Sequence, residues 1–297
     1  MIATKTYAPR WYNTYAIHFF RLVMKYILPA SWFRSALPEI QNRTAVDGFF
    51  NLEIVSHCWG YSNMLTYQLS SFVNYPPTKC AVTVTVFYAK EDTKSQAVLD
   101  FFNQKTVENV TWNFQALSKG KLFRRAIGRN IAARNSTAQW LWFTDCDIIF
   151  HENCLDSLAE QLQGKQASLY YPAQERTTEM LAQDDPMLRE DSEPQLVNID
   201  TEGFSLHSRD KAKGAFQIVH GDVARAIGYC ADLAIYQTLS EHWCKCYEDR
   251  EFRWLLGSQG IPLNVDGVYQ IRHIHKGRYK KNTFRSKLRS KIRRIQE

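Results

Sequence analysis

The sequence predicts an α/β fold with a mainly parallel sheet and helices on both faces. Segments typical of strands and of helices alternate four times in the first 171 residues, as in folds built from strand–helix–strand units. The apolar run that starts at Trp140 is typical of a central parallel strand buried on both faces. With 297 residues, of which 45% are apolar, the chain can form one large domain of this kind.

Apolar periodicity and turn residues define the elements of the first half. Residues rich in β-branched side chains, or alternating apolar and polar ones, predict strands at 52–56, 81–88, 110–117, 140–150 and 167–171. Apolar residues at helical spacing predict helices at 61–73, 95–102, 123–136 and 153–162. Pro76-Pro77 ends the first of these helices.

The second half is less regular. Residues 173–213 are polar and acidic with two prolines, and we expect an irregular insertion there. A strand is expected at 214–220, followed by a helix with Asp222 as its N-cap. A further helix should begin near Glu248 and end at Gly257. The last strand is expected at 266–275 and a basic helix at 283–295.

Two carboxylates end the central strand. Alternation along a strand points Asp145 and Asp147 to one side and Cys146, which we interpret as a packing residue, to the other. Ligands of open α/β sheets bind at the carboxyl ends of strands. Two converging carboxylates repel each other, so a hard divalent cation bridged to a phosphate would suit them. A solvated turn is the ordinary alternative for such a short pattern.

Three further groups of residues suit the same chemistry. Arg124, Arg125, Arg129 and Asn130 lie on the helix before the central strand, where arginines suit diphosphate oxygens, although Arg124 fits a solvated helix face better. Gly128 within that helix suggests a close approach by another group. Glu248-Asp249 offers a general base, or simply favourable charges at a helix start. His273 and His275 are two candidates for a third metal ligand, or ordinary histidines.

The order of these elements resembles GT-A-fold glycosyltransferases, especially family 2. Arg125–Asp147 is similar to the arginine/asparagine helix, strand and D-x-D element of that family, and Glu248–Phe252 to its E-D-x-x-[FL] element. Gly214-Ala215-Phe216 resembles its glycine–aromatic acceptor-side strand, and Val55–Val73 its nucleotide-binding start. The resemblance covers about residues 50–275, but His57-Cys58-Trp59-Gly60 departs from the small polar run usual after the first strand.

This resemblance implies transfer of a sugar, with inversion, from a nucleotide-diphosphate sugar to an acceptor hydroxyl, by an enzyme of the hexosyltransferase type. A UDP-sugar is the first candidate donor, and a carbohydrate or glycolipid the expected acceptor. Mn(II) or Mg(II) would be held by Asp145 and Asp147, with His273 or His275. Asp249 would be the base, with Glu248 in reserve. The implied donor contacts are Asp92, Arg125, Arg129, Asn130, Asp145 and Asp147, and the implied acceptor contacts are Gly214 and Phe216.

Charge divides the chain into three parts. The overall net charge is +7. Residues 276–297 include ten basic residues and one acidic residue, and residues 1–36 include five basic residues and no acidic one. We expect an aromatic, basic segment at 1–45, a GT-A domain at 46–275 with donor half 50–172 and acceptor half 173–275, and a basic amphipathic helix at 276–297. Basic ends suit an anionic membrane surface, and scattered charges disfavour nucleic acid. Seven scattered cysteines without a C-x-x-C pair suit a reducing compartment, and no run is long and apolar enough to span a membrane. We therefore expect a cytoplasmic protein, with a peripheral location at the inner membrane face as an option.

Two other classes of function compete with glycosyl transfer. A D-x-D after an apolar strand also fits phosphatases and phosphotransferases of the haloacid dehalogenase type, in which Asp145 would be the nucleophile. That class usually carries the motif on an early strand, and the only acidic pair downstream of matching kind is Asp184-Asp185. A non-catalytic, membrane-associated nucleotide-sugar-binding module is the second alternative, although Asp145, Asp147 and Asp249 are all present.

Overall fold

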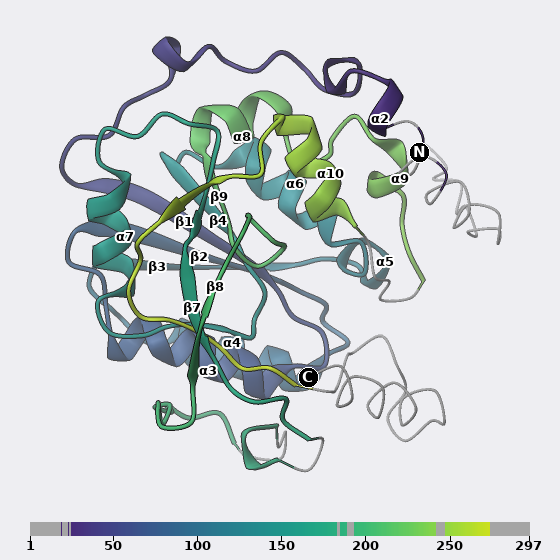
Figure 1. Ribbon diagram of the computed structural model, residues 1–297. Coiled ribbons are helices and arrows are strands. Elements are labelled where there is room, and N and C mark those ends of the chain that lie inside the picture. Colours follow the sequence, from purple (N-terminus) through teal and green to yellow (C-terminus); the bar gives the residue numbers. More distant parts are fainter. Residues whose placement is uncertain are drawn as a thin grey trace.

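A seven-stranded sheet forms the centre of the molecule (Figure 1). The structure is a computed structural model that describes residues 19, 23, 25–182, 185–188, 193–241 and 247–273. The strand order is β10-β6-β9-β4-β1-β2-β3, and only β9 runs antiparallel to its neighbours. The bounds are β1 Phe50–His57, β2 Cys80–Tyr88, β3 Val110–Ala116, β4 Trp140–Phe143, β6 Leu169–Pro172, β9 Gln217–His220 and β10 Ile261–Leu263.

Helices cover both faces of this sheet, which confirms the predicted fold class. In Figure 1, α6, α8 and α10 lie above the sheet, and α3 and α4 lie below it. The helices are α3 Ser62–Asn74, α4 Thr93–Asn103, α6 Arg125–Asn135, α7 Cys154–Leu162, α8 Gly221–Ile227 and α10 Glu248–Leu256. Shorter turns are α2 Lys25–Ile27, η2 Ala30–Phe33, η3 Ile40–Asn42, α5 Lys119–Leu122, η4 Pro186–Leu188 and α9 Ala234–Gln237.

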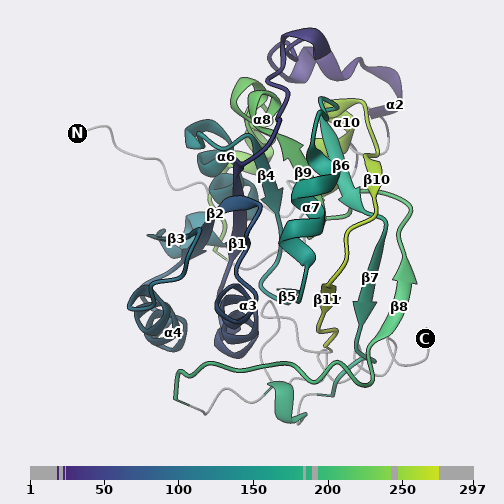
Figure 2. The same cartoon turned by 90° about the vertical axis from the view of Figure 1, so that its left-hand side faces the viewer.

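A second, four-stranded sheet stands in front of the first in Figure 1 and on the right in Figure 2. Its order is β5-β11-β7-β8, with bounds β5 Ile148–Phe150, β7 Gln174–Thr177, β8 Ser205–Ser208 and β11 Val268–Gln270. The expected single strand at 140–150 is therefore wrong. The chain leaves the large sheet after Phe143, turns through Asp145 and Asp147, and re-enters the small sheet as β5.

Other sequence expectations also need correction. Residues 173–213 are not wholly irregular, because β7 and β8 pair as antiparallel strands within them. The last strand spans only Val268–Gln270. The N-cap of α8 is His220, whose Nδ1 accepts from the Asp222 amide at 3.2 Å, because the helix begins two residues earlier than the acidic side chain suggested.

The basic helix expected at 283–295 lies outside the described residues, as does most of the segment before residue 25. Within the described part of the chain, no helix combines the length and apolar character needed to cross a bilayer.

The central strand is held by aromatic packing. Trp140, Trp142 and Phe143 of β4 are fully buried. Trp142 meets Phe150 of β5 edge-on, with ring centroids 5.0 Å apart, and its Nε1 donates to the Ala215 carbonyl oxygen at 3.0 Å. These contacts fix β4 against both sheets and so fix the acidic turn that follows it.

Candidate functional site

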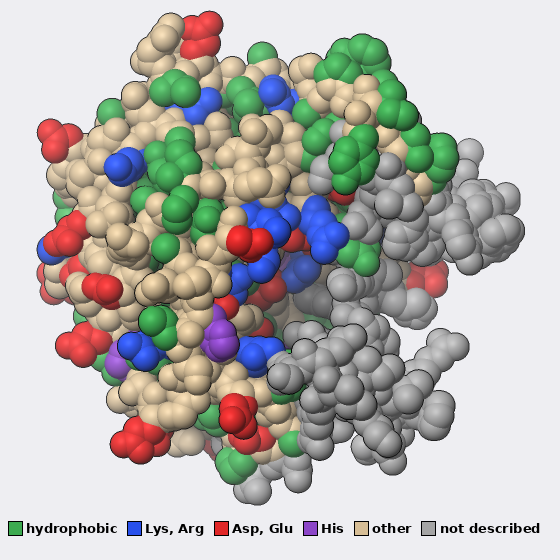
Figure 3. All heavy atoms as spheres, viewed as in Figure 1, with side chains coloured by type: hydrophobic (Ala, Val, Ile, Leu, Met, Phe, Trp, Pro, Cys, Tyr) green, Lys and Arg blue, Asp and Glu red, His purple; other side chains and the backbone are tan. Residues whose placement is uncertain are grey.

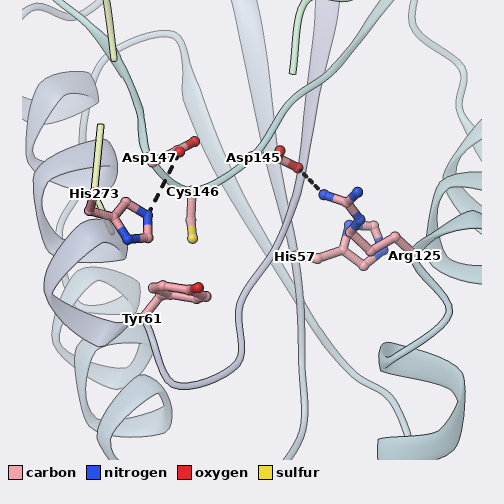
Figure 4. A pocket seen from close by; sticks show the side chains of 7 residues that line it. All are labelled: His57, Tyr61, Arg125, Asp145, Cys146, Asp147 and His273. Carbon is pink, nitrogen blue, oxygen red and sulfur yellow. Dashed lines mark hydrogen bonds and ion pairs between the residues drawn. The ribbon is translucent and has the colours of Figure 1, made fainter. Parts of the chain in front are cut away.

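A pocket lies where the carboxyl ends of β1 and β4 meet the small sheet (Figure 4). Its cavity volume is about 80 Å³, and it is lined by His57, Tyr61, Arg125, Asp145, Cys146, Asp147 and His273. In the space-filling view, acidic and basic side chains gather around a hollow near the centre of this face, beside α10 (Figure 3). The structure thus brings four of the predicted site residues together: Arg125, Asp145, Asp147 and His273.

The acidic pair lies in a turn rather than on a strand. The Ile148 amide donates to the Asp145 carbonyl oxygen at 3.2 Å, and Gln68 Nε2 of α3 donates to the same oxygen at 2.9 Å. The two carboxylates diverge, with Asp145 toward Arg125 and Asp147 toward His273 (Figure 4). Strand alternation was therefore the wrong reason to expect them together, because the chain has already left the sheet. Cys146 also lines the pocket, although it is 6% exposed.

Arg125 links the acidic turn to the start of α10. Its Nη1 lies 2.7 Å from Asp145 Oδ1, and its Nε lies 3.2 Å from Glu248 Oε1. The Glu248 side chain is 1% exposed, so this ion pair holds a buried carboxylate. Arg129 Nη2 approaches Asp145 Oδ1 at 3.4 Å from the other side. Asp145 is thus held between two arginines.

Asp147 faces the small sheet. Its Oδ2 lies 3.9 Å from His273 Nε2 and accepts from Gln270 Nε2 at 3.2 Å. The Ile271 amide donates to its backbone oxygen at 3.0 Å. The carboxylate and imidazole are types of side chain that bind divalent metals, and both open into the pocket. Within the described residues, however, no three His, Cys, Asp or Glu side chains cluster closely enough to form a complete metal site, and His275 lies outside those residues.

His57 also lines the pocket, although no sequence pattern predicted a role for it. It ends β1, is 4% exposed, and neither ring nitrogen has a hydrogen-bond partner among the described residues. Burial, followed by the charges of Arg129 and Arg125, holds its pKa well below the ordinary value, so the ring is neutral. The signal was Gly128: a Cβ there would lie 2.2 Å from His57 Nε2. The close approach predicted from that glycine is therefore made by the His57 ring.

Arg129 and Asn130 belong to the scaffold behind the pocket. Arg129 is completely buried and donates to the Tyr229 hydroxyl and the Gly214 carbonyl oxygen, both at 2.9 Å. Asn130 Oδ1 accepts from the Tyr229 amide at 3.1 Å. Neither residue is among those that line the pocket. Their contacts instead join α6 to the segment around Tyr229.

Asp92 also has a structural position. It is the N-cap of α4, where its carboxylate accepts from the Ser95 amide at 3.3 Å and from the Ser95 hydroxyl at 2.6 Å. The same carboxylate accepts from the Gly60 amide at 2.7 Å, which joins the start of α4 to the turn after β1.

The acidic start of α10 separates two environments. Glu248 is buried against Arg125, whereas the Asp249 side chain is 22% exposed, with Oδ2 at 3.4 Å from Arg253 Nη1. Gly214 lies beside Asp249, since a Cβ on the glycine would be 3.6 Å from the Asp249 Cβ. Phe216 is 2% exposed beneath Arg209, whose guanidinium carbon lies 3.5 Å from the ring centroid. Its ring is therefore covered by protein.

Residues 94–229 match the model of "Glycosyl transferase family 2". The matched segment is just under half of the chain and includes α6, β4 and the Asp145–Asp147 turn. The match supports a glycosyltransferase of family 2. No curated protein matches this chain in sequence.

Solved structures of TarS from S. aureus are similar to this chain at low identity. The 1–349 fragment in complex with UDP-GlcNAc has 10% identity and a TM-score of 0.45, over 78% of this chain and 62% of that one. TarS itself has 14% identity and a TM-score of 0.45, over 74% of this chain and 36% of that one. This chain therefore spans less than two thirds of the length of these structures.

Proposed function

We propose that the protein transfers a sugar from a nucleotide-diphosphate sugar to an acceptor hydroxyl, with inversion and with help from a divalent metal. The main support for this proposal is the family match over residues 94–229. The matched segment includes the turn whose acidic residues line the pocket together with Arg125 and His273. Binding at the carboxyl ends of parallel strands is also what an open α/β sheet favours. A UDP-sugar is the first candidate donor, a hexose the candidate group transferred, and a carbohydrate or glycolipid the acceptor.

Asp147 and His273 are the residues that we propose to hold Mn(II) or Mg(II). They converge on the pocket from the acidic turn and from the segment after β11. The bound cation would supply Lewis-acid charge to offset the charge that develops on the leaving nucleoside diphosphate. Asp145 is engaged by Arg125 and Arg129, so we assign it mainly to orienting Arg125, which lines the pocket, toward the diphosphate. His275 stays a proposal from sequence alone.

Asp249 is the proposed general base. Its carboxylate would take the proton of the acceptor hydroxyl while that oxygen bonds to the anomeric carbon and the bond to the diphosphate oxygen breaks. Partial exposure and the adjacent Gly214, which lacks a side chain, support an open approach to this carboxylate. Glu248 is buried in an ion pair, which favours a positioning role. The reserve assignment of Glu248 as base is thereby weakened.

The donor half of the proposal is tested by calorimetric titration with UDP, GDP and CDP, with Mn(II) and with EDTA. We expect one nucleotide to bind more tightly with Mn(II), and Asp147→Asn to lose that gain. Equal nucleotide affinities with Mn(II) and with EDTA, for all three nucleotides, would refute the metal assignment. Inversion is tested by proton NMR of the first product formed, in which a retained anomeric configuration would refute it.

The competing classes have less support. Phosphatase chemistry needs Asp145 as a nucleophile, whereas here its Oδ1 lies near two arginines, and the family match favours glycosyl transfer. Asp184, from the pair that this alternative would use, lies outside the described residues. A non-catalytic module would need no accessible carboxylate near the site, whereas the Asp249 side chain is 22% exposed.

The chain ends are proposed to act at a membrane. We keep 1–45 and 276–297 as basic segments flanking the domain at 46–275, and propose peripheral attachment to an anionic surface. Among described residues before the domain, Tyr26, Ile27 and Trp32 are 82%, 68% and 70% exposed. Exposed aromatic and aliphatic side chains of this kind suit the interface of a bilayer.

A further inference from the structure

One face of the small sheet continues from the pocket. Strand register pairs Gln270 with Thr177, and Thr177 with Ser205, and directly paired residues share a face of a sheet. Gln270 on this face donates to Asp147. Residues two positions along each strand, such as His207, share the same face. The face that bears Thr177, Ser205 and His207 is therefore the one turned toward the acidic turn.

A groove with a volume of about 630 Å³ lies on this face. Its lining includes the hydroxyls of Thr177 and Ser205, the imidazole of His207, the carboxylate of Glu179 and the guanidinium of Arg272. Arg272 of the groove directly precedes His273 of the pocket in the chain. Among the described residues that line the groove, Met180 alone has a wholly apolar side chain. This composition suits a ligand rich in hydroxyl groups and offers little to a lipid tail.

Thr177 supplies an independent sign of a ligand. Its side chain is 3% exposed, lines the groove, and has a hydroxyl with no hydrogen-bond partner among the described residues. The neighbouring Thr178 differs, because its hydroxyl accepts from the Arg272 amide at 2.8 Å. A buried hydroxyl without a partner is costly, so an arriving hydroxyl group would remove that penalty.

We propose that this groove binds the acceptor and that the part of the acceptor held there is carbohydrate. The inference rests on the proposed function, since it places the acceptor beside the proposed donor pocket. It also moves the main acceptor contacts away from Phe216, whose ring is covered, to Thr177 of β7 and His207 of β8. The acceptor chain would run over the small sheet and present one hydroxyl toward Asp249.

The test uses the full chain and an array of immobilised oligosaccharides, comprising neutral hexose and N-acetylhexosamine chains and anionic chains. The tightest binder is then titrated by calorimetry against the unaltered protein, Thr177→Val and His207→Ala. Thr177→Val keeps the side-chain shape and removes the hydroxyl, so we expect affinity to fall about tenfold. Arg176→Gln and Ser208→Ala are the matched controls, because both lie on the opposite face of the same strands and should leave affinity unchanged.

UDP binding is measured on the same samples and separates the two proposals. Loss of oligosaccharide affinity in Thr177→Val with unchanged UDP binding supports the groove. Absence of nucleotide binding in every protein would defeat the proposed function, while the oligosaccharide titrations would still decide the groove. Unchanged oligosaccharide affinity in both groove variants, or no oligosaccharide bound by the unaltered protein, overturns the inference. Competition by detergent micelles that carry no sugar headgroup would also overturn it.

Discussion

At the scale of single residues, two adjacent carboxylates have different surroundings. Glu248 is buried and paired with Arg125, whereas Asp249 is partly exposed beside Gly214. A carboxylate enclosed by protein cannot meet an acceptor hydroxyl, but it can hold the start of α10 in place. The pair Glu248-Asp249 was visible in the sequence, but the division of roles depends on the distant Arg125, which strand and helix patterns do not locate.

Substitution of Asp249 should therefore lower turnover, whereas substitution of Glu248 should lower stability. Asp249→Asn is expected to keep the melting temperature and nucleotide binding while turnover falls about 10²–10⁴-fold, as for loss of a general base. Glu248→Gln is expected to lower the free energy of unfolding by about 1–3 kcal/mol, because Arg125 loses a charged partner. Thermal melts and turnover on both variants check this. Normal turnover in Asp249→Asn would remove it from the mechanism.

His57 predicts a pH dependence of stability. Its pKa in the folded protein lies below that of the unfolded chain, chiefly because the ring is buried. Below about pH 6.5 the unfolded chain takes up a proton that the folded protein does not. Stability is therefore full above that pH and falls, by up to about 1.4 kcal/mol per pH unit, as the pH is lowered.

Replacing the ring isolates this contribution. His57→Phe, compared with the unaltered protein by denaturant unfolding at pH 7 and pH 5, should lose less stability over that interval. His151 and His220, whose pKa values burial also lowers, titrate in both proteins and cancel in the comparison. Equal losses in the two proteins would mean that His57 takes up its proton in the folded state.

At the scale of elements, periodicity predicted most of the large sheet and its helices. Strands β1 to β4 and helices α3, α4 and α6 overlap the predicted segments, because each buries an apolar face within one layer. The small sheet was largely missed. Strands β7 and β8 have only four residues each, and all of β8 is exposed, so no apolar pattern marks it. The break after Phe143 was missed because apolar residues resume at Ile148.

The contact between α6 and β1 can be tested through Gly128. Alanine is the better helix former by about 1 kcal/mol, yet its Cβ would lie 2.2 Å from His57 Nε2 and 3.0 Å from Phe87 Cδ2. Gly128→Ala is expected to destabilise the protein by about 1–3 kcal/mol. Gly120→Ala is the control, because its nearest neighbour would be 3.6 Å away. Equal stabilities of the two variants would contradict the packing described.

At the scale of the whole molecule, the distribution of charge along the chain separates the body, residues 37–275, from two basic ends. Acidic and basic side chains of the body gather around the central hollow and also lie near the edges of this face (Figure 3). The ends were predictable from composition alone, since a count of charges needs no structure. The position of the groove was not, because it depends on the register of the small sheet, which brings Thr177 level with Gln270.

The basic C-terminal segment should contribute to membrane binding. Removal of residues 276–297 is expected to weaken sedimentation with anionic phospholipid vesicles, and the difference should shrink as salt is raised, because salt screens exposed charges. Neutral vesicles are the control and should show no difference. Unchanged binding to anionic vesicles after the truncation would assign the segment another purpose.

Release of nucleoside diphosphate tests the central claim most directly. The full chain is incubated with a panel of nucleotide-sugars, Mn(II) and the oligosaccharide that binds most tightly, alongside Asp147→Asn and an EDTA control. We predict release from one donor, lost on chelation and in Asp147→Asn, because Asp147 lies at the pocket with His273. No release from any donor, together with no metal-dependent nucleotide binding, would contradict glycosyl transfer at this site.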